Sequence, residues 1–283
     1  MAAELAERAA AARSCPDPRG VHRLRVATRR TRSALRTFRD VLPESLDPGV
    51  RAELRSLARA LGAVRDLDVY RERFAAMRSK LTAEDAAALV RHERYLDTER
   101  RRAAAELAAI LDEGFAERLE GFAARAADVR AADARAIDAE GKTVRRAARA
   151  YIERGKKGVL KHGARIDRHS PSDRLHALRI RIKRFRYLLE FCSPLFEARV
   201  EAALPAAIRA QDLLGTYQDA CTAVARLRGY AAAAPAKGEF RAEMFALGQI
   251  AALERRAARK ARNRFAKEWP AIEKAIEAFT IDD

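Results

Sequence analysis

The sequence predicts an all-α protein, and three observations carry this prediction. Of the 283 residues, 49% are hydrophobic, and many of these are alanine, whereas the chain has only 13 glycines and 9 prolines. Charged residues make up a further 34%, and Ala, Leu, Glu, Arg and Lys all favour helices. No segment alternates β-branched and polar residues for long enough to build a sheet. The length fits two ordinary domains, or one domain made of two similar halves.

Apolar residues at a helical period, interrupted by Pro and Gly, predict where the helices lie. Ser172 or Asp173 is a suitable N-cap for the helix that carries His176. A bend or break is expected near Gly62 and again near Gly215. The predicted helices are residues 1–13, 20–41, 48–79, 83–111 and 114–130 in the first half, and 141–163, 173–192, 197–232, 238–266 and a short tail at 268–280 in the second.

An internal repeat organises the chain. The segment HRLRVATRRTRSALRTF, which begins at His22, aligns with HALRIRIKRFRYLLEFC, which begins at His176. A second block follows in both copies, because Leu61-Gly62-Ala-Val-Arg65-Asp66 matches Leu214-Gly215-Thr-Tyr-Gln218-Asp219. The sequence therefore predicts one domain over residues 1–283 that consists of two helical repeats, 1–135 and 136–283.

Each repeated helix has an apolar face and a basic face, because residues three or four apart lie on the same side of a helix. The apolar sets are Leu24, Thr28, Thr31, Leu35 and Phe38 in the first copy, and Leu178, Ile182, Phe185 and Leu189 in the second. We call the basic sets the first stripe and the second stripe. The first stripe is His22, Arg25, Arg29, Arg32 and Arg36, flanked by Arg30, and the second stripe is His176, Arg179, Lys183 and Arg186, flanked by Arg184.

The stripes point to an anionic ligand. The chain has 57 Lys and Arg against 40 Asp and Glu, a formal net charge of +17. A charged helical face is usually only solvated, but solvated faces mix signs, and neither stripe contains an acid between its histidine and Arg186 or Arg36. Like charges on one helical face oppose folding unless a polyanion relieves them, so we expect the two stripes to line a groove for a long, uniform anion.

A tyrosine and several further arginines are candidates for extending this surface. For the arginines, the alternative is a solvated helical face. Tyr187 follows Arg186 directly and is either a hydroxyl donor at the rim or, as we prefer, a core aromatic. The basic candidates are Arg145, Arg149, Arg255, Arg259 and Arg262.

The two motif blocks, HxLRVxxRRxRxxLRxF with LGxVRD and LHxLRxxxKRFRYLLEF with LGxxQD, resemble the CHAD domain, the conserved histidine α-helical domain. The resemblance covers nearly the whole chain. It implies two four-helix bundles related by pseudo-twofold symmetry, a basic central surface that binds inorganic polyphosphate, and association with polyphosphate granules. It also implies that the residues of both stripes, with Arg30 and Arg184, contact the ligand.

The sequence departs from this family in two respects. Many relatives carry an N-terminal CYTH-type domain with an ExExK signature, which does not occur before His22, so that domain's hydrolase activity is not carried over. Glu190 stands where the first copy has Arg36, so the two stripes need not be equally cationic.

Other functions are less well supported. No H-E-x-x-H motif, phosphate-binding loop or C-x-x-C motif is present. This favours a binding protein without metal or cofactor over an enzyme. Asp66, Asp68 and Asp219 are the best catalytic carboxylates, although helix caps or arginine partners explain them more simply. Non-specific nucleic-acid binding is the alternative function. No secretory signal or membrane span is apparent, so a cytoplasmic location without membrane contact is expected.

Overall fold

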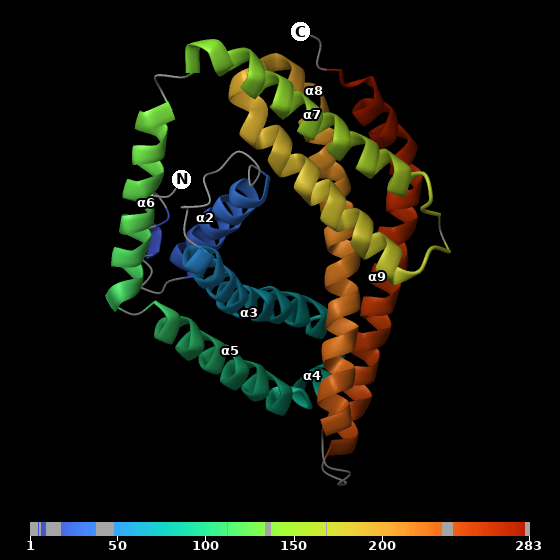
Figure 1. The fold of residues 1–283 in the computed structure, drawn as a ribbon. Coiled ribbons are helices and arrows are strands. Elements are labelled where there is room, and N and C mark those ends of the chain that lie inside the picture. The colour runs from blue at the N-terminus through green and yellow to red at the C-terminus, as the bar shows by residue number, and fades with distance from the viewer. Residues whose placement is uncertain are drawn as a thin grey trace. The chain divides into compact units, whose positions relative to one another are not determined.

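A computed structural model of the chain describes residues 5, 7–9, 18–37, 48–111, 113–133, 137–167, 169–233 and 240–280. Every regular element among these residues is a helix (Figure 1), so the all-α prediction is confirmed. The chain divides into two compact units. The first unit is Met1–Arg71 with Glu93–Thr143, and the second unit is Glu72–His92 with Val144–Asp283.

The first unit is a helical bundle with its own hydrophobic core. Its helices are α2 (Pro18–Thr37), most of α3 (Pro48–Arg78), most of α5 (Val90–Ile110) and α6 (Glu113–Asp133). The fully buried side chains at its centre are leucines and phenylalanines, including Leu24, Leu54, Leu61, Phe115 and Leu119.

Two predictions for the first half are wrong in detail. The predicted helix at 83–111 is divided into α4 (Ala83–Ala87) and α5, because residues 88 and 89 form a turn between them. Thr82 caps α4, since its hydroxyl accepts a hydrogen bond of 3.2 Å from the backbone N–H of Asp85. In contrast, α3 is unbroken at Gly62, where an added Cβ would meet nothing within 4 Å. The end of the predicted helix 20–41 and most of the helix 1–13 lie outside the described residues.

The second unit contains the end of α3, α4 and three long helices, α7 (Ile137–Gly163), α8 (Ser172–Ala233) and α9 (Arg241–Ala278). We expected one helix to end before Pro194 and another to end at residue 266, and this is wrong, because α8 continues through Pro194 and α9 continues without a break from Arg241 to Ala278. A proline removes one hydrogen bond and bends a helix without necessarily ending it. Figure 1 shows that α8 changes direction where its colour passes from yellow to orange, in the part that holds Pro194 and Pro205. We call the parts before Pro194 and after Pro205 the first limb and the second limb. Gly215, in the second limb, likewise does not interrupt the helix.

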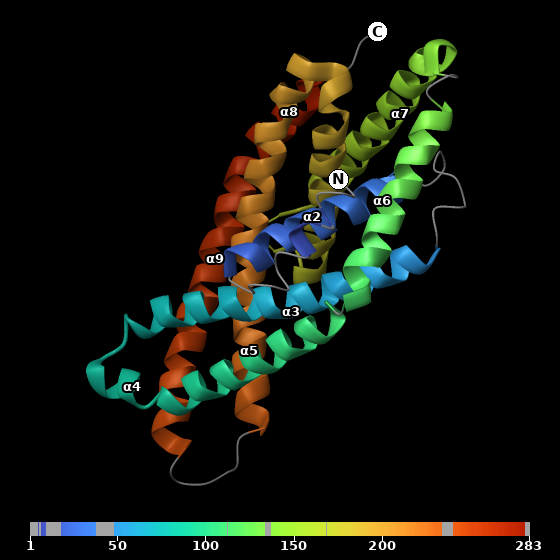
Figure 2. The ribbon, with the colours of Figure 1, turned by 90° about the vertical axis from the view of Figure 1, so that its left-hand side faces the viewer.

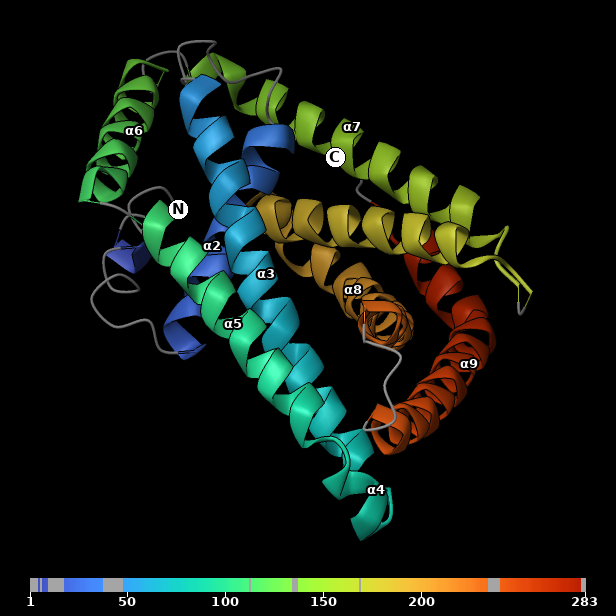
Figure 3. The same ribbon diagram turned by 90° about the horizontal axis from the view of Figure 1, so that it is seen from below.

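Close packing of α7 on the first limb and of α9 on the second limb forms the core of this unit. Figures 1 and 3 show α7 beside the yellow first limb, and a Cβ added to Gly155 of α7 would lie 3.1 Å from the ring of Phe185. Figures 1 and 2 show the orange second limb beside α9. Buried residues from all three helices, among them Ile152, Leu214 and Phe265, form one hydrophobic cluster.

The predicted apolar faces of both repeated helices are buried. In α8, Leu178, Ile182, Phe185 and Leu189 are each at most 1% exposed. In α2, Leu24, Thr28, Thr31 and Leu35 are at most 9% exposed, whereas Phe38 lies outside the described residues. Each basic stripe is therefore carried by a helix whose neighbouring face is fixed in a core.

Candidate anion-binding surfaces

The first stripe lies on α2 with its cations partly buried against one another. His22, Arg30 and Arg36 are exposed, while Arg25, Arg29 and Arg32 are half-buried. Burial, followed by the charges of Arg36 and Arg55, lowers the pKa of Arg32. The first stripe is thus a surface where positive charge is crowded and incompletely hydrated.

Two arginines of α3, which were not predicted to bind a ligand, join the first stripe. Burial lowers the pKa of His22, and the charge of Arg65 is the next largest cause, ahead of Arg25 and Arg29. The charge of Arg55 likewise lowers the pKa of Arg32. The sequence contained a signal for these two residues. Arg55 lies seven residues before Gly62 and Arg65 lies three residues after it, and these spacings place both arginines on one face of α3.

The second stripe lies on the first limb of α8. His176 and Arg184 are exposed, whereas Arg179, Lys183 and Arg186 are half-buried. The Nε of Arg179 is buried and has no hydrogen-bond partner among the described residues. A buried donor without a partner is costly, so Arg179 is held in this position at a cost in free energy.

The second motif block packs directly on the second stripe. The Nδ1 of His176 lies 3.1 Å from Oε1 of Gln218 in the second limb, and it is the donor because the amide oxygen can only accept. Arg179 lies over Gly215, where an added Cβ would come within 4.0 Å of its Nε. The sequence repeated these two blocks without showing that they touch, and the fold brings them together.

The second stripe is less cationic than the first. Arg186 pairs with Glu190 one turn further along α8, with 3.1 Å between Nε and Oε1. The guanidinium carbon of Arg186 also lies 5.2 Å from the ring centre of Tyr187. Tyr187 itself is only 2% exposed, which favours its interpretation as a core aromatic over a hydroxyl donor at the rim.

Of the further basic candidates, Arg262 on α9 lies near the second limb of α8. Burial raises the pKa of Tyr217 in the second limb, and Arg262 is near enough for its charge to oppose that shift. The Nε of Arg262 is buried without a hydrogen-bond partner among the described residues. Arg255 and Arg259 are exposed on the same helix.

The α7 candidates lie elsewhere on the second unit. The guanidinium carbon of Arg145 is 5.9 Å from the ring centre of Phe196, which lies 20 residues beyond His176. Arg149 is half-buried one turn further along α7.

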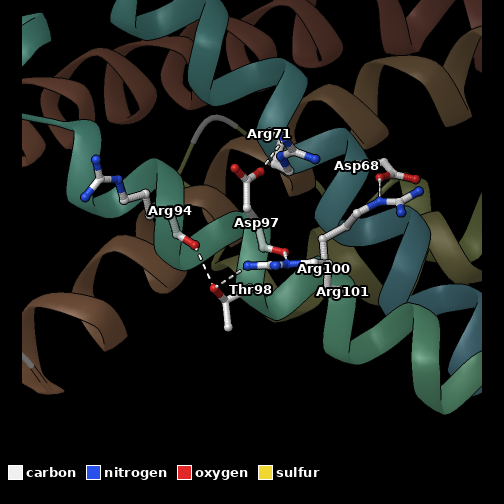
Figure 4. Close-up of polar contacts among 7 residues, drawn as sticks. All are labelled: Asp68, Arg71, Arg94, Asp97, Thr98, Arg100 and Arg101. Carbon is white, nitrogen blue, oxygen red and sulfur yellow. Dashed lines mark hydrogen bonds and ion pairs between the residues drawn. The ribbon is translucent and has the colours of Figure 1, made fainter.

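Two carboxylates outside the stripes pair with arginines (Figure 4), and one histidine is buried. The Nε of Arg100 on α5 donates to Oδ1 of Asp68 on α3 at 3.0 Å, and Arg71 pairs with Asp97 between the same two helices. His92 is 1% exposed, and its burial lowers the imidazole pKa to about 4. Among the described residues, no three His, Cys, Asp or Glu side chains are grouped to hold a metal ion.

None of the helices in the described parts of the chain has a stretch long and apolar enough to cross a bilayer.

Comparison with known proteins identifies the family. The family model for the CHAD domain matches residues 2–228. The chain therefore belongs to the CHAD family, some of whose members bind polyphosphate. Among curated proteins, none matches this chain.

Two solved structures have a similar fold. One is the crystal structure of the CHAD domain from the plant Ricinus communis, with a TM-score of 0.70 and 26% sequence identity, covering 99% of this chain and 89% of that one. The other is PptA from Streptomyces chartreusis, with a TM-score of 0.65 and 22% identity, covering 95% of this chain and 97% of that one. The sequence-based expectation of a CHAD fold is confirmed.

Proposed function

We propose that this protein binds inorganic polyphosphate through the first and second stripes. The observation that carries the proposal is the crowding of Arg32, Arg36 and Arg55 in the first unit, where partial burial and mutual repulsion already lower an arginine pKa. A ligand with one negative charge per repeating unit relieves that repulsion along the whole stripe. Arginine adds paired donors that match phosphate oxygens.

The same surfaces suit nucleic acid less well. Proteins that bind single strands stack bases on exposed aromatic rings. Among the described residues, the large exposed aromatics are Tyr95 on α5 and Phe245 on α9, and neither lies on α2 or on the first limb of α8. A chain of phosphates needs no stacking platform, so the stripes favour polyphosphate over nucleic acid.

The proposal includes binding without catalysis or a cofactor, and association with polyphosphate granules in the cytoplasm. The non-catalytic part is supported by Asp68, a leading candidate for a catalytic carboxylate, which accepts a hydrogen bond of 3.0 Å from Arg100. The groove expected between the stripes stays a prediction. Incubation with polyphosphate and Mg²⁺ or Mn²⁺ should release no phosphate, and release above the background would refute the non-catalytic part of the proposal.

A competition experiment tests the ligand. Labelled long-chain polyphosphate is bound at about 150 mM salt, where purely electrostatic binding is already weakened, and is then challenged with duplex DNA and with RNA. Polyphosphate should bind more tightly than either nucleic acid. Equal or tighter binding of nucleic acid would refute the proposal.

A charge-reversed variant tests the site. Arg29→Glu combined with Lys183→Glu changes one half-buried cation in each stripe and should abolish polyphosphate binding. The control is Arg101→Glu with Arg102→Glu, which makes the same change in net charge at exposed positions on α5. Circular dichroism checks that both variants are folded. Persistent binding by the stripe variant would place the site elsewhere.

A further inference from the structure

The two repeats differ in charge at three matched positions around their stripes. The register of the two motif blocks aligns Arg36 with Glu190, Arg55 with Ile208 and Arg65 with Gln218. These positions carry a formal charge of +3 in the first unit and −1 in the second. The repeat therefore preserves most of each stripe, and replaces the charge at its end and the charges beside it.

In the first unit, the residue opposite the histidine is a cation. Leu61 and Val64 of α3 are buried in the same core as Leu24 of α2. Val64 directly precedes Arg65 in the sequence. This packing places the Arg65 guanidinium close enough to influence His22 electrostatically. The charge opposite His22 is thus fixed by the packing of two helices.

In the second unit, the residue at the same position is a neutral hydrogen-bond acceptor. Gln218 accepts the Nδ1 hydrogen of His176 at 3.1 Å, and its own Nε2 lies 3.5 Å from Oγ1 of Thr222. These contacts hold the His176 ring in one orientation, so that in the imidazolium form its Nε2–H can donate to a phosphate oxygen of a ligand. The exposed Ile208, where the first unit has Arg55, adds no charge.

We propose that the two stripes bind polyphosphate by different means: Arg65 makes the first stripe a charge-driven site, and Gln218 makes the second stripe a site that depends on an oriented imidazole. This inference rests on the proposed function. Arg65 contacts the ligand directly, whereas Gln218 is a positioning residue that acts through His176. The first unit provides most of the salt-sensitive affinity, and the second unit provides a contact whose strength depends on geometry.

The two means of binding respond differently to salt. Each cation that neutralises a phosphate releases counterions, so removing one such contact lowers the salt slope of the affinity by about 0.7 to 0.9. Removing the hydrogen bond between His176 and Gln218 takes no charge from the site, so it leaves the salt slope unchanged and weakens binding by about fivefold at every salt concentration. The slope therefore separates the two roles.

The test measures the affinity of the full chain for long-chain inorganic polyphosphate between about 50 and 400 mM salt. Arg65→Gln makes the first repeat like the second and should weaken binding about eightfold at the lowest salt and about twofold at the highest. Gln218→Leu should weaken binding by about fivefold at every salt concentration. Arg65→Lys, which keeps the charge, should retain the slope. Arg102→Gln, which removes an exposed charge paired with Glu106 at 3.4 Å on α5, is the matched control and should change nothing.

A double-mutant cycle tests the positioning role. In a His176→Gln background, Gln218→Leu should cause no further loss, because the residue through which it acts is gone. Independent losses from the two changes would overturn the role of Gln218. An unchanged slope in Arg65→Gln, with normal binding by the unaltered protein, would overturn the role of Arg65. Absence of polyphosphate binding by the unaltered protein would instead refute the proposed function, and this inference with it.

Discussion

At the scale of single residues, one glycine decides how closely α7 and α9 pack in the second unit. Gly163, the last residue of α7, is buried against Trp269 of α9. A Cβ added to Gly163 would lie 1.7 Å from Cζ2 of Trp269, far closer than two carbon atoms can approach. Trp269 is itself only 5% exposed and belongs to the hydrophobic cluster of this unit, so the indole has little room to move.

We therefore expect Gly163→Ala to destabilise the protein by about 1 to 3 kcal/mol, the usual cost of overpacking a core. Urea denaturation measures the change. The control is Gly158→Ala in the same helix, where an added Cβ meets nothing within 4 Å, and where alanine should stabilise the helix by about 0.5 to 1 kcal/mol. Equal effects of the two changes would contradict the packing at Trp269.

At the scale of elements, buried polar contacts hold the end of α3 and the start of α5 to α8 and α9. The Nε of Arg73 lies 2.8 Å from both carboxylate oxygens of Glu254, which is 1% exposed. The hydroxyl of Tyr230 donates to Glu243 at 2.8 Å, and the ring of His92 packs edge-on to Tyr230. These contacts explain why residues 72–92 belong to the second unit although they lie within the first repeat.

Breaking the buried pair should be far more harmful than breaking an exposed one. Glu254→Ala leaves the Arg73 guanidinium without its partner and should destabilise the protein by about 3 to 5 kcal/mol, whereas Arg73→Met combined with Glu254→Leu should be close to neutral. Chemical denaturation measures both. The control is Glu268→Ala, which removes the more accessible partner of Arg209 and Arg264, a side chain that is 29% exposed, and should have a much smaller effect. A double variant as unstable as Glu254→Ala would contradict this account.

At the scale of the whole molecule, the net charge of +17 opposes folding, and a bound polyanion should offset it. At a free polyphosphate concentration about 100 times the Kd, binding to the folded state alone stabilises it by about 2.7 kcal/mol. We expect the Tm to rise by several degrees on addition of long-chain polyphosphate at low salt. Monophosphate at the same total phosphate concentration should raise it less. An equal rise with sodium chloride of matched ionic strength would show that screening, and not binding, is responsible.

The sequence by itself predicted the helices, the apolar faces and the stripes, because these depend on local periodicity. Leu178, Ile182, Phe185 and Leu189 are spaced for one helical face, and all four are buried. Helix ends at prolines were predicted less well. Pro194 was predicted to separate two helices, but α8 continues through it, and Leu189, Cys192 and Val200 on either side are buried in the same core. The packing of these side chains outweighs the one hydrogen bond that the proline removes.

Only the tertiary structure decided which groups meet. Contact between His176 and Gln218, 42 residues apart, depends on how α8 changes direction, and no spacing in the sequence encodes that turn. The position of Arg65 beside His22 depends in the same way on the packing of α2 against α3. Helical periodicity determines which residues share a face, because it is a property of neighbours along the chain. The partner of that face is determined by burial of the whole core, a non-local property that becomes visible only when the chain is folded.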